Sequence, residues 1–252
     1  MMYRLGAAIV LLSLLVSGTR GQGSAGELAL YESQRIVDMP TAGVLPTGGI
    51  QFRAIVFDSG GMTTEALIAP LARVQIGLGY SGSGIVGSGN VRWQGPPALL
   101  LRWRFLDETP VLPALAIGVE TLGRGEVANG AFATAAPGAY FTLSKQFRWW
   151  LGGCAIHAGI GYGLDLRFNG GDINMWIGAE QSIGRSMALS IEANPQSIER
   201  SRPLLLNLAA RWSVLRGVTL EFYLRDLLAR SASQPRRWVG IECIARLSEI
   251  LW

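Results

Sequence analysis

Leu204-Leu-Leu-Asn-Leu-Ala-Ala-Arg-Trp-Ser-Val214 is the stretch of this 252-residue sequence that most clearly indicates a fold. Its even-numbered residues are all apolar, whereas Asn207, Arg211 and Ser213 share the other parity. A period of two is typical of a β-strand with one apolar and one polar face. The same alternation returns from Val218 to Leu224 after a glycine at 217, which predicts a tight β-hairpin.

Segments with similar alternation recur along the rest of the chain, separated by Gly, Pro, Asn or Asp. They cover residues 50–57, 71–80, 98–105, 112–121, 138–147, 151–164, 173–182, 187–194 and 237–247. With the hairpin they make eleven candidate strands. Bacterial outer-membrane barrels have even strand numbers. We therefore expect twelve strands, or ten as the alternative, and place the missing one in 28–37 or 85–93.

Composition favours a membrane barrel over a soluble protein. The chain is 49% hydrophobic but only 16% charged, against about 25% charged residues in ordinary soluble domains. No apolar run after Val16 approaches the ~20 residues of a spanning helix, and a closed barrel is the other structure that satisfies its backbone inside lipid. A soluble sandwich or lipocalin also alternates. However, aromatic residues gather at the segment ends, as they do in interfacial girdles: Tyr80, Trp93, Trp103, Phe105, Tyr140, Phe147, Trp149, Trp150, Tyr162, Trp212 and Trp238.

The chain therefore divides into three predicted parts. Arg4 followed by the apolar run Leu5–Val16 predicts a signal peptide over residues 1–22. Residues 23–47 contain several prolines and glycines, which predicts a lead-in or a plug segment rather than a strand. Residues 48–252 are predicted to form a closed antiparallel up-and-down transmembrane β-barrel, all-β and monomeric, in contact with the lipid of a bacterial outer membrane.

Several strings resemble a bacterial family of outer-membrane barrels, the YjbH-like group associated with exopolysaccharide production. They are Asp38-Met-Pro-Thr-Ala-Gly-Val-Leu-Pro-Thr-Gly48, the glycine-rich stretch from Gly77 to Gly89, Arg104-Phe-Leu-Asp-Glu-Thr109 before Pro113-Ala-Leu-Ala-Ile-Gly118, Ser144-Lys145, His157-Ala-Gly159 and Arg225-Asp-Leu-Leu228. The resemblance implies a barrel, an outer-membrane location and a link to polysaccharide secretion, with polysaccharide or its export components as partners. It implies no catalytic residues.

Charged residues on the polar parity form the candidate functional set. An Arg or Lys facing lipid at mid-depth costs about 2–4 kcal/mol, so we expect these side chains in the lumen. Two interpretations follow: ion pairs that fill a closed lumen, or a narrow channel for a polar or anionic solute. The predicted lumen residues are Arg53, Arg73, Arg102, Arg104, Glu120, Lys145, His157, Glu180, Glu192, Arg211, Glu221, Arg225, Glu242 and Arg246.

Motifs for other chemistry are weak. Gly82-Ser-Gly-Ile-Val-Gly87 matches a dinucleotide fingerprint, but no helical periodicity follows it. His157 is the single histidine, which makes a poor metal site. A hydrolase centred on it would need Ser144 and either Asn174 or Glu180 within reach. We predict no cofactor, metal, catalytic residue or disulfide between Cys154 and Cys243.

The predicted function is non-enzymatic, in envelope structure or exopolysaccharide secretion. A narrow passive channel, a membrane-embedded hydrolase and a soluble lipocalin-like binder are the alternatives. The net charge of +4, with both signs interspersed, does not support nucleic-acid binding.

Overall fold

The computed structural model describes residues 31–87, 90–128, 131–164, 170–195, 204–229 and 234–250. The predicted signal peptide lies outside these residues. The long strands are β1 (Gly49–Phe57), β2 (Gly61–Leu71), β3 (Val74–Ser83), β5 (Ala98–Leu106), β6 (Ala114–Glu120), β9 (Gly138–Trp149), β10 (Gly152–Leu164), β11 (Gly170–Ile183), β12 (Met187–Asn194), β13 (Leu205–Leu215), β14 (Val218–Arg225) and β15 (Arg236–Arg246).

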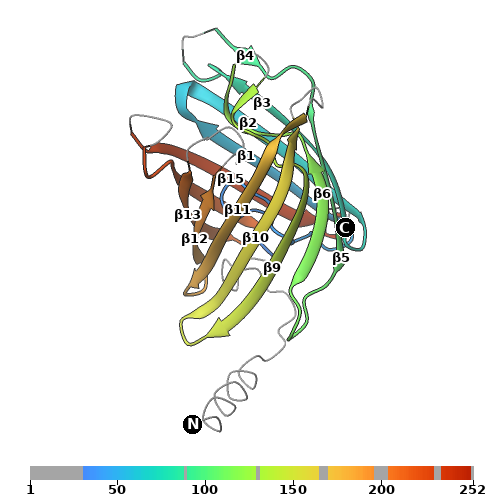
Figure 1. Cartoon of the computed structure of the whole chain (residues 1–252). Coiled ribbons are helices and arrows are strands. Elements are labelled where there is room, and N and C mark those ends of the chain that lie inside the picture. The colour runs from blue at the N-terminus through green and yellow to red at the C-terminus, as the bar shows by residue number, and fades with distance from the viewer. Residues whose placement is uncertain are drawn as a thin grey trace.

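These strands form one closed antiparallel barrel (Figure 1). Each strand pairs with its neighbours in the chain, and β1 pairs with β15 to close the ring. The sheet counts thirteen strands because the two-residue β4 (Arg92–Trp93) extends β3 at the rim, so twelve strands make the ring. The prediction of a twelve-stranded up-and-down barrel is confirmed.

The position predicted for the twelfth strand is wrong. That strand is β2, and neither 28–37 nor 85–93 supplies it. In β2 the inward side chains include Thr63 and Glu65 but also Leu67 and Ala69, while Thr64 faces outward. Because both faces mix polar and apolar residues, the period of two is not visible in the sequence.

The polarity of the barrel is the reverse of that of a soluble protein. On β12, Leu189 and Ile191 are 48% and 44% exposed, while Ser190 and Glu192 between and beside them are 1% and 0% exposed. The same contrast holds around the ring, so apolar side chains cover the outside and polar ones the inside. A soluble barrel buries its apolar face instead. The outer surface is that of a transmembrane barrel.

The two ends of the barrel differ in their connections. At one end the hairpins are short, with residues 72–73, 150–151 and 216–217 linking β2 to β3, β9 to β10 and β13 to β14. We call it the short-turn end; β1 begins there and β15 ends there, followed by the four-residue α2 (Leu247–Ile250). At the other end, residues 121–137 connect β6 to β9. This connection contains the small hairpin of β7 (Arg124–Ala128) and β8 (Ala131–Thr134). The three-residue η1 (Asp58–Gly60) also lies there.

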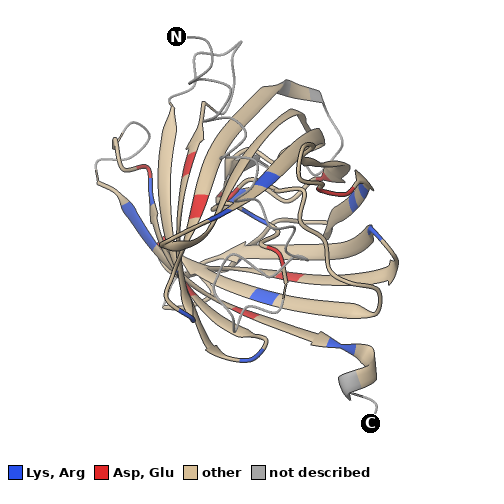
Figure 2. Cartoon of the chain, turned by 90° about the horizontal axis from the view of Figure 1, so that it is seen from below, with Lys and Arg blue, Asp and Glu red and all other residues tan. Residues whose placement is uncertain are grey.

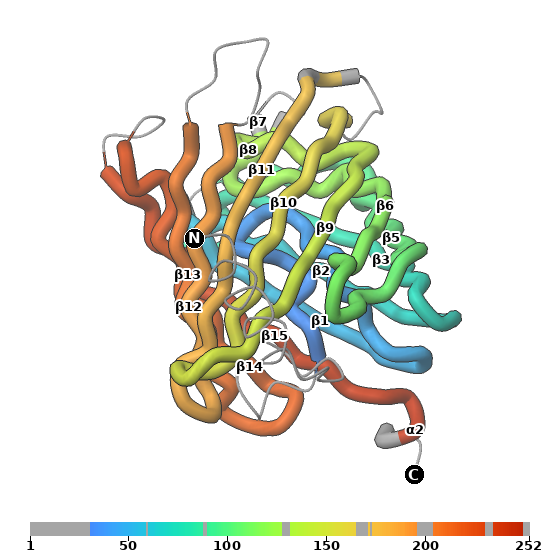
Figure 3. The backbone as a smooth tube through the Cα atoms, turned by 60° about the horizontal axis from the view of Figure 1, so that its bottom comes forward, coloured from blue at the N-terminus to red at the C-terminus, as the bar shows by residue number. Residues whose placement is uncertain are grey.

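Residues 31–48, which we call the lumen segment, run inside the barrel (Figure 3, blue). The segment folds back on itself, with a β-bridge between Arg35 and Pro40. Ile36, Val37 and Met39 pack in one apolar cluster with inward aromatic residues that include Tyr140 and Trp176. A Cβ atom built on Gly178 would lie 2.6 Å from Ile36 Cγ2. The absence of a side chain at Gly178 therefore leaves the room that Ile36 of the lumen segment occupies.

No helix in the described part of the chain is long and apolar enough to cross a membrane.

Candidate functional site

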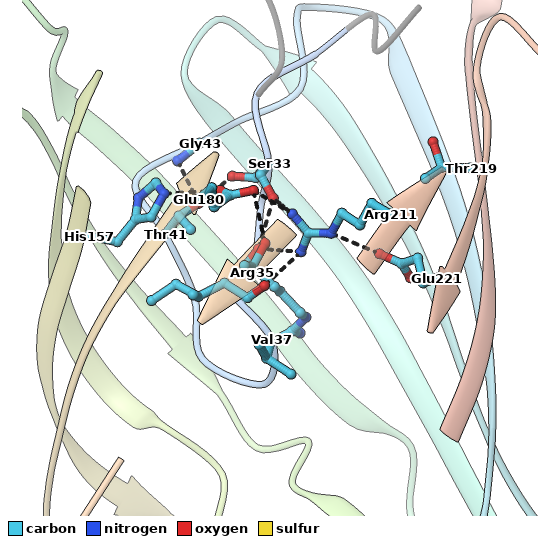
Figure 4. A network of polar contacts seen from close by, with 12 residues as sticks. Ser33, Arg35, Val37, Thr41, Gly43, His157, Glu180, Arg211, Thr219 and Glu221 are labelled. Carbon is cyan, nitrogen blue, oxygen red and sulfur yellow. Dashed lines mark hydrogen bonds and ion pairs between the residues drawn. The ribbon is translucent and has the colours of Figure 1, made fainter. Parts of the chain in front are cut away.

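Arg211 on β13 points into the lumen and joins the wall to the lumen segment (Figure 4). Its Nη1 lies 2.7 Å from Glu180 Oε2, and its Nε lies 3.2 Å from Glu221 Oε1. The same guanidinium donates to the backbone oxygen of Ile36 at 2.9 Å. It also donates to the backbone oxygen of Arg35 and to Ser33 Oγ. Arg211 thus binds the lumen segment, and the carboxylates of Glu180 and Glu221 balance its positive charge.

Arg53 extends this network across the first and last strands. Its Nε lies 3.2 Å from Glu221 Oε2, and its Nη2 contacts Glu242 on β15. Tyr223 donates its hydroxyl to Glu221 Oε2 at 2.6 Å, and Gln51 Nε2 donates to Glu242 Oε2 at 2.6 Å. Charges taken out of water are tolerated when they are paired and hydrogen-bonded. Each charge of this cluster has an ion-pair partner, although Arg53 Nε, Arg211 Nε and Glu221 Oε1 make no hydrogen bond.

A second cluster is completed by Arg35 from the lumen segment. Its Nη2 lies 2.6 Å from Glu120 Oε1 and 3.3 Å from Glu65 Oε2. Arg124, from β7 in the long connection, lies 2.6 Å from Glu65 Oε1 and 3.6 Å from Glu120 Oε1. Two guanidinium groups therefore balance two carboxylates, and one of the four comes from the segment.

The carboxylate of Glu192 on β12 binds backbone N–H groups of the lumen segment. Its Oε2 accepts the N–H groups of Val37, Asp38 and Met39 at 3.0, 2.9 and 2.9 Å. Successive N–H groups that point at one anion form a backbone nest. Asn207 donates to Glu192 Oε1 at 3.1 Å, so both carboxylate oxygens are used.

Asp38 forms a further ion pair with the wall. Its Oδ2 accepts Arg225 Nε at 2.9 Å and Asn207 Nδ2 at 3.2 Å. The Arg225 guanidinium also lies 3.7 Å from the ring centre of Trp238. Arg102 adds another wall contact, because its Nη1 donates to Gly43 O at 2.7 Å and its Nε to the Tyr140 hydroxyl at 3.0 Å.

Ser144, His157 and Glu180 form a buried hydrogen-bonded row on β9, β10 and β11. Ser144 Oγ lies 2.7 Å from His157 Nδ1, and His157 Nε2 lies 2.9 Å from Glu180 Oε1. Ser144 Oγ also accepts the Ala42 N–H at 2.9 Å, so the backbone of the lumen segment joins this row. Asn174 instead faces Met39 Sδ at 3.8 Å.

The surroundings of this row argue against catalysis. Acyl transfer needs room for a substrate at the serine and donors aimed at its oxyanion. The lumen segment covers Ser144, and the adjacent cavity, lined by Gly43 and Ala114 among others, measures about 10 Å³. Such a volume holds about one water molecule. The row is a hydrogen-bonded support for the segment.

The lumen interior is closely filled elsewhere too. A cavity between Arg35, Arg53 and Glu120 also measures about 10 Å³. Seen from below, charged positions of both signs are spread round the ring of strands (Figure 2). Among the described residues, no group of three or more His, Cys, Asp or Glu side chains could hold a metal ion.

The structure places ten of the fourteen predicted residues on inward positions within these networks or beside them: Arg53, Arg102, Glu120, His157, Glu180, Glu192, Arg211, Glu221, Arg225 and Glu242. Arg104 and Arg246 also have inward parity, but they lie at the short-turn end. There Arg104 contacts Glu32, and it lies 2.9 Å from Asp107 Oδ1 through its Nε. Burial raises the pKa of Glu32, although Arg104 opposes the shift.

Two of the predicted lumen residues lie elsewhere. Lys145 has outward parity, opposite Ile156. Its Nζ donates to the carbonyl oxygens of Thr109 and Pro110 at 2.5 and 3.1 Å. The long side chain can reach this polar connection from the outer face, so an outward lysine near the rim is tolerated. Arg73 lies in the β2–β3 turn, paired with Asp107.

Sequence reasoning missed four charged residues of the lumen. Glu65 was missed because its strand was not predicted, and Arg124 because β7 lies in a connection. Arg35 and Asp38 belong to the breaker-rich stretch whose path was left open. The signal that could have found Arg35 and Asp38 is that they are the two charges in a short, mostly apolar run, residues 35–44.

No family model matches this sequence, and no curated protein matches it. Among solved structures, the KdgM porin is similar with a TM-score of 0.47, at 10% identity, over 77% of this chain and 98% of that chain. The NanC porin is similar with a TM-score of 0.43, at 7% identity, over 78% of this chain and 98% of that chain. Because both scores are below 0.5, the fold assignment rests on the strand pairing and the exposed faces described above.

Proposed function

We propose that this protein is a non-enzymatic outer-membrane β-barrel that is closed at rest by its own lumen segment. The proposal rests on the position of that segment inside the barrel, where Glu192 and Arg211 form hydrogen bonds with its backbone. The exposed apolar belt supports a location in lipid. In bacterial barrels the short turns face the periplasm, so we place the short-turn end on that side.

Two measurements test this proposal directly. The processed protein should fractionate with the outer membrane and migrate faster unboiled than boiled on a gel. In planar bilayers the folded wild-type protein should show no steady conductance. A soluble periplasmic protein would contradict the location, and a steady ohmic conductance from well-folded protein would contradict the closed lumen.

The cellular role that we propose is in envelope structure or exopolysaccharide secretion, with polysaccharide or export components as partners. Its support is the resemblance of the strings from Asp38 to Gly48 and from Arg104 to Gly118 to the YjbH-like group. A strain that lacks the gene should lose part of its surface polysaccharide. Normal amounts of surface polysaccharide in that strain would overturn this role and leave the barrel and its closure untouched.

A second candidate function is a channel that opens when the lumen segment leaves its seat. The specific observation is the mode of attachment, because between Arg35 and Gly43 the wall holds the segment through wall side chains, while the segment's β-bridge is internal. Gly48 links the segment to β1, and hydrogen bonds to Ala69 O and from the Leu247 N–H, at 2.8 and 2.9 Å, fix it to the wall, so the part that can leave lies before it. A wall lined by polar groups can be hydrated once the segment departs, which lowers the cost of opening.

Conductance of two opposed variants tests this second function. Glu192→Ala should raise the frequency of open events, because three backbone N–H groups of the segment lose their acceptor. Ala42 packs against Ala114 inside the lumen, so the pair Ala42→Cys and Ala114→Cys, with both native cysteines changed to serine, should lock the segment. If Glu192→Ala, the oxidised double-cysteine variant and the reduced double-cysteine variant all conduct equally, a movable plug is excluded.

A further inference from the structure

Three glutamine side chains inside the barrel each carry a buried polar atom that no protein group satisfies. Gln34 belongs to the lumen segment, Gln51 to β1 and Gln75 to β3, and they are 4%, 0% and 1% exposed. The atoms that form no hydrogen bond with the protein are Gln34 Nε2, Gln51 Oε1 and Gln75 Oε1. Since the large majority of buried polar side-chain atoms in folded proteins have a partner, these three atoms point to a bound molecule.

Direct hydrogen bonds fix how the three amides are oriented. Gln51 Nε2 donates to Glu242 Oε2 at 2.6 Å, so the amide oxygen of Gln51 points away from that carboxylate. Gln75 Nε2 donates to Gln34 Oε1 at 2.6 Å. If both of these amides were reversed, the same hydrogen bond would form in the other direction, and one donor and one acceptor would again remain. The unmet hydrogen bonds therefore do not depend on how the amide atoms are assigned.

All three glutamines line one small cavity. It measures about 10 Å³, and Leu67 and Leu100 form part of its boundary. A volume of this size holds about one water molecule. The cavity thus brings two acceptors and one donor together around a space for a single small molecule.

The charges around the cavity disfavour an ion of either sign. Three arginines and two glutamates line it: Arg35, Arg53, Arg102, Glu65 and Glu120. A cation would be repelled by the three guanidinium groups, and an anion would be repelled by the two carboxylates and would meet two amide oxygens. A neutral molecule that donates two hydrogen bonds and accepts one matches the three open amide atoms. Water has this hydrogen-bonding capacity and this size.

We propose that the cavity binds one water molecule, which accepts a hydrogen bond from Gln34 and donates to Gln51 and Gln75. Buried waters typically make about three hydrogen bonds of this kind. In the part of the chain that the structure describes, no side chain of β1 forms a direct hydrogen bond with the lumen segment, because Gln51 and Arg53 contact Glu242 and Glu221 on the wall.

The water therefore links the lumen segment to β1, the strand that closes the ring against β15. Elsewhere the wall binds the segment directly, as Glu192 and Arg211 do. The closed barrel thus combines direct contacts with one water-mediated contact at its closing strand. This inference concerns the seated segment, so it holds whether or not the lumen opens.

A crystal structure of the detergent-solubilised full chain, at a resolution that shows ordered waters, tests the site. One density peak should lie about 2.7–3.2 Å from each of the three amide groups. A peak at about 2.0–2.6 Å that contacts only oxygen atoms would be a metal cation instead and would overturn the proposal. The absence of any peak in the cavity would overturn it as well.

Gln51→Met tests the link to β1, because methionine has a similar length and lacks the amide oxygen. The peak should disappear in this variant. Gln94→Met is the matched control, since Gln94 is another buried glutamine with an open Oε1, but it pairs with Ser81 at the far end of β3 and does not line this cavity. The control should keep the peak.

An unchanged peak in Gln51→Met would show that β1 does not hold the water, and it would overturn the proposed link. Loss of the peak in both variants would show that it depends on the general packing of the barrel, which also contradicts the proposal. The density of the wild-type protein decides whether the water is present even if Gln51→Met does not fold.

Discussion

Glu192 Oε2 accepts the backbone N–H of Asp38 at 2.9 Å, across 154 residues of sequence. The glutamate is fully buried on the inner wall, and the aspartate lies at the tip of the lumen segment. The contact places a carboxylate where three successive N–H groups need an acceptor. Three backbone N–H groups of the lumen segment therefore share this one side-chain acceptor.

Glu192→Ala should destabilise the folded barrel, because the Val37, Asp38 and Met39 N–H groups lose their acceptor, and each buried donor left without a partner costs about 1–3 kcal/mol. Glu192→Gln keeps a side-chain oxygen and should cost less. The measurement is the temperature at which the fast-migrating unboiled band disappears. Glu126→Ala is the control, since Glu126 forms only an exposed pair with Arg92. Equal temperatures for Glu192→Ala and the control would contradict the importance of this contact.

Arg53→Met should be among the most damaging single changes in the lumen. It leaves the carboxylates of Glu221 and Glu242 without their shared guanidinium, and breaking a buried pair costs about 3–5 kcal/mol. Adding Glu242→Gln to Arg53→Met should recover part of the loss. Denaturant unfolding followed by tryptophan fluorescence measures it. If the double variant is no more stable than Arg53→Met, the coupling between these residues is absent.

The Ser144–His157–Glu180 row should support structure rather than hydrolysis. We expect wild-type protein and Ser144→Ala to show the same background rate with short-chain and lipid esters. Ser144→Ala should still lower stability by about 1–3 kcal/mol, because the buried Ala42 N–H loses its acceptor. Ester turnover by the wild type that disappears in Ser144→Ala would show the opposite.

Depth in the membrane should govern the cost of charge on the outer face. Ile177 is 57% exposed near the middle of β11, and Ile183 is 43% exposed at its end. Ile177→Arg should cost about 2–4 kcal/mol and Ile183→Arg about 0–1 kcal/mol. Folding into lipid vesicles across a denaturant series measures both. Equal costs at the two depths would argue against a spanning belt.

Strand alternation in the sequence predicted most of the wall. Segments such as 204–214 and 218–224 became β13 and β14 with the expected parity, because a period of two depends only on neighbouring residues. The prediction failed where faces were mixed: in β2, both sides carry polar and apolar residues, and in β9 the parity of Lys145 was misassigned. Inward charges were predicted well because charge on the lipid face is costly.

Local alternation and the cost of charge in lipid are enough to predict the class of fold, the even ring of strands and the inward side of most charges. Which charges meet depends on the folded barrel. Arg35 joins Glu120 across 85 positions and Arg211 reaches Ile36 across 175. Such pairs depend on ring closure, on register and on the path of the lumen segment, and no local pattern of residues encodes these.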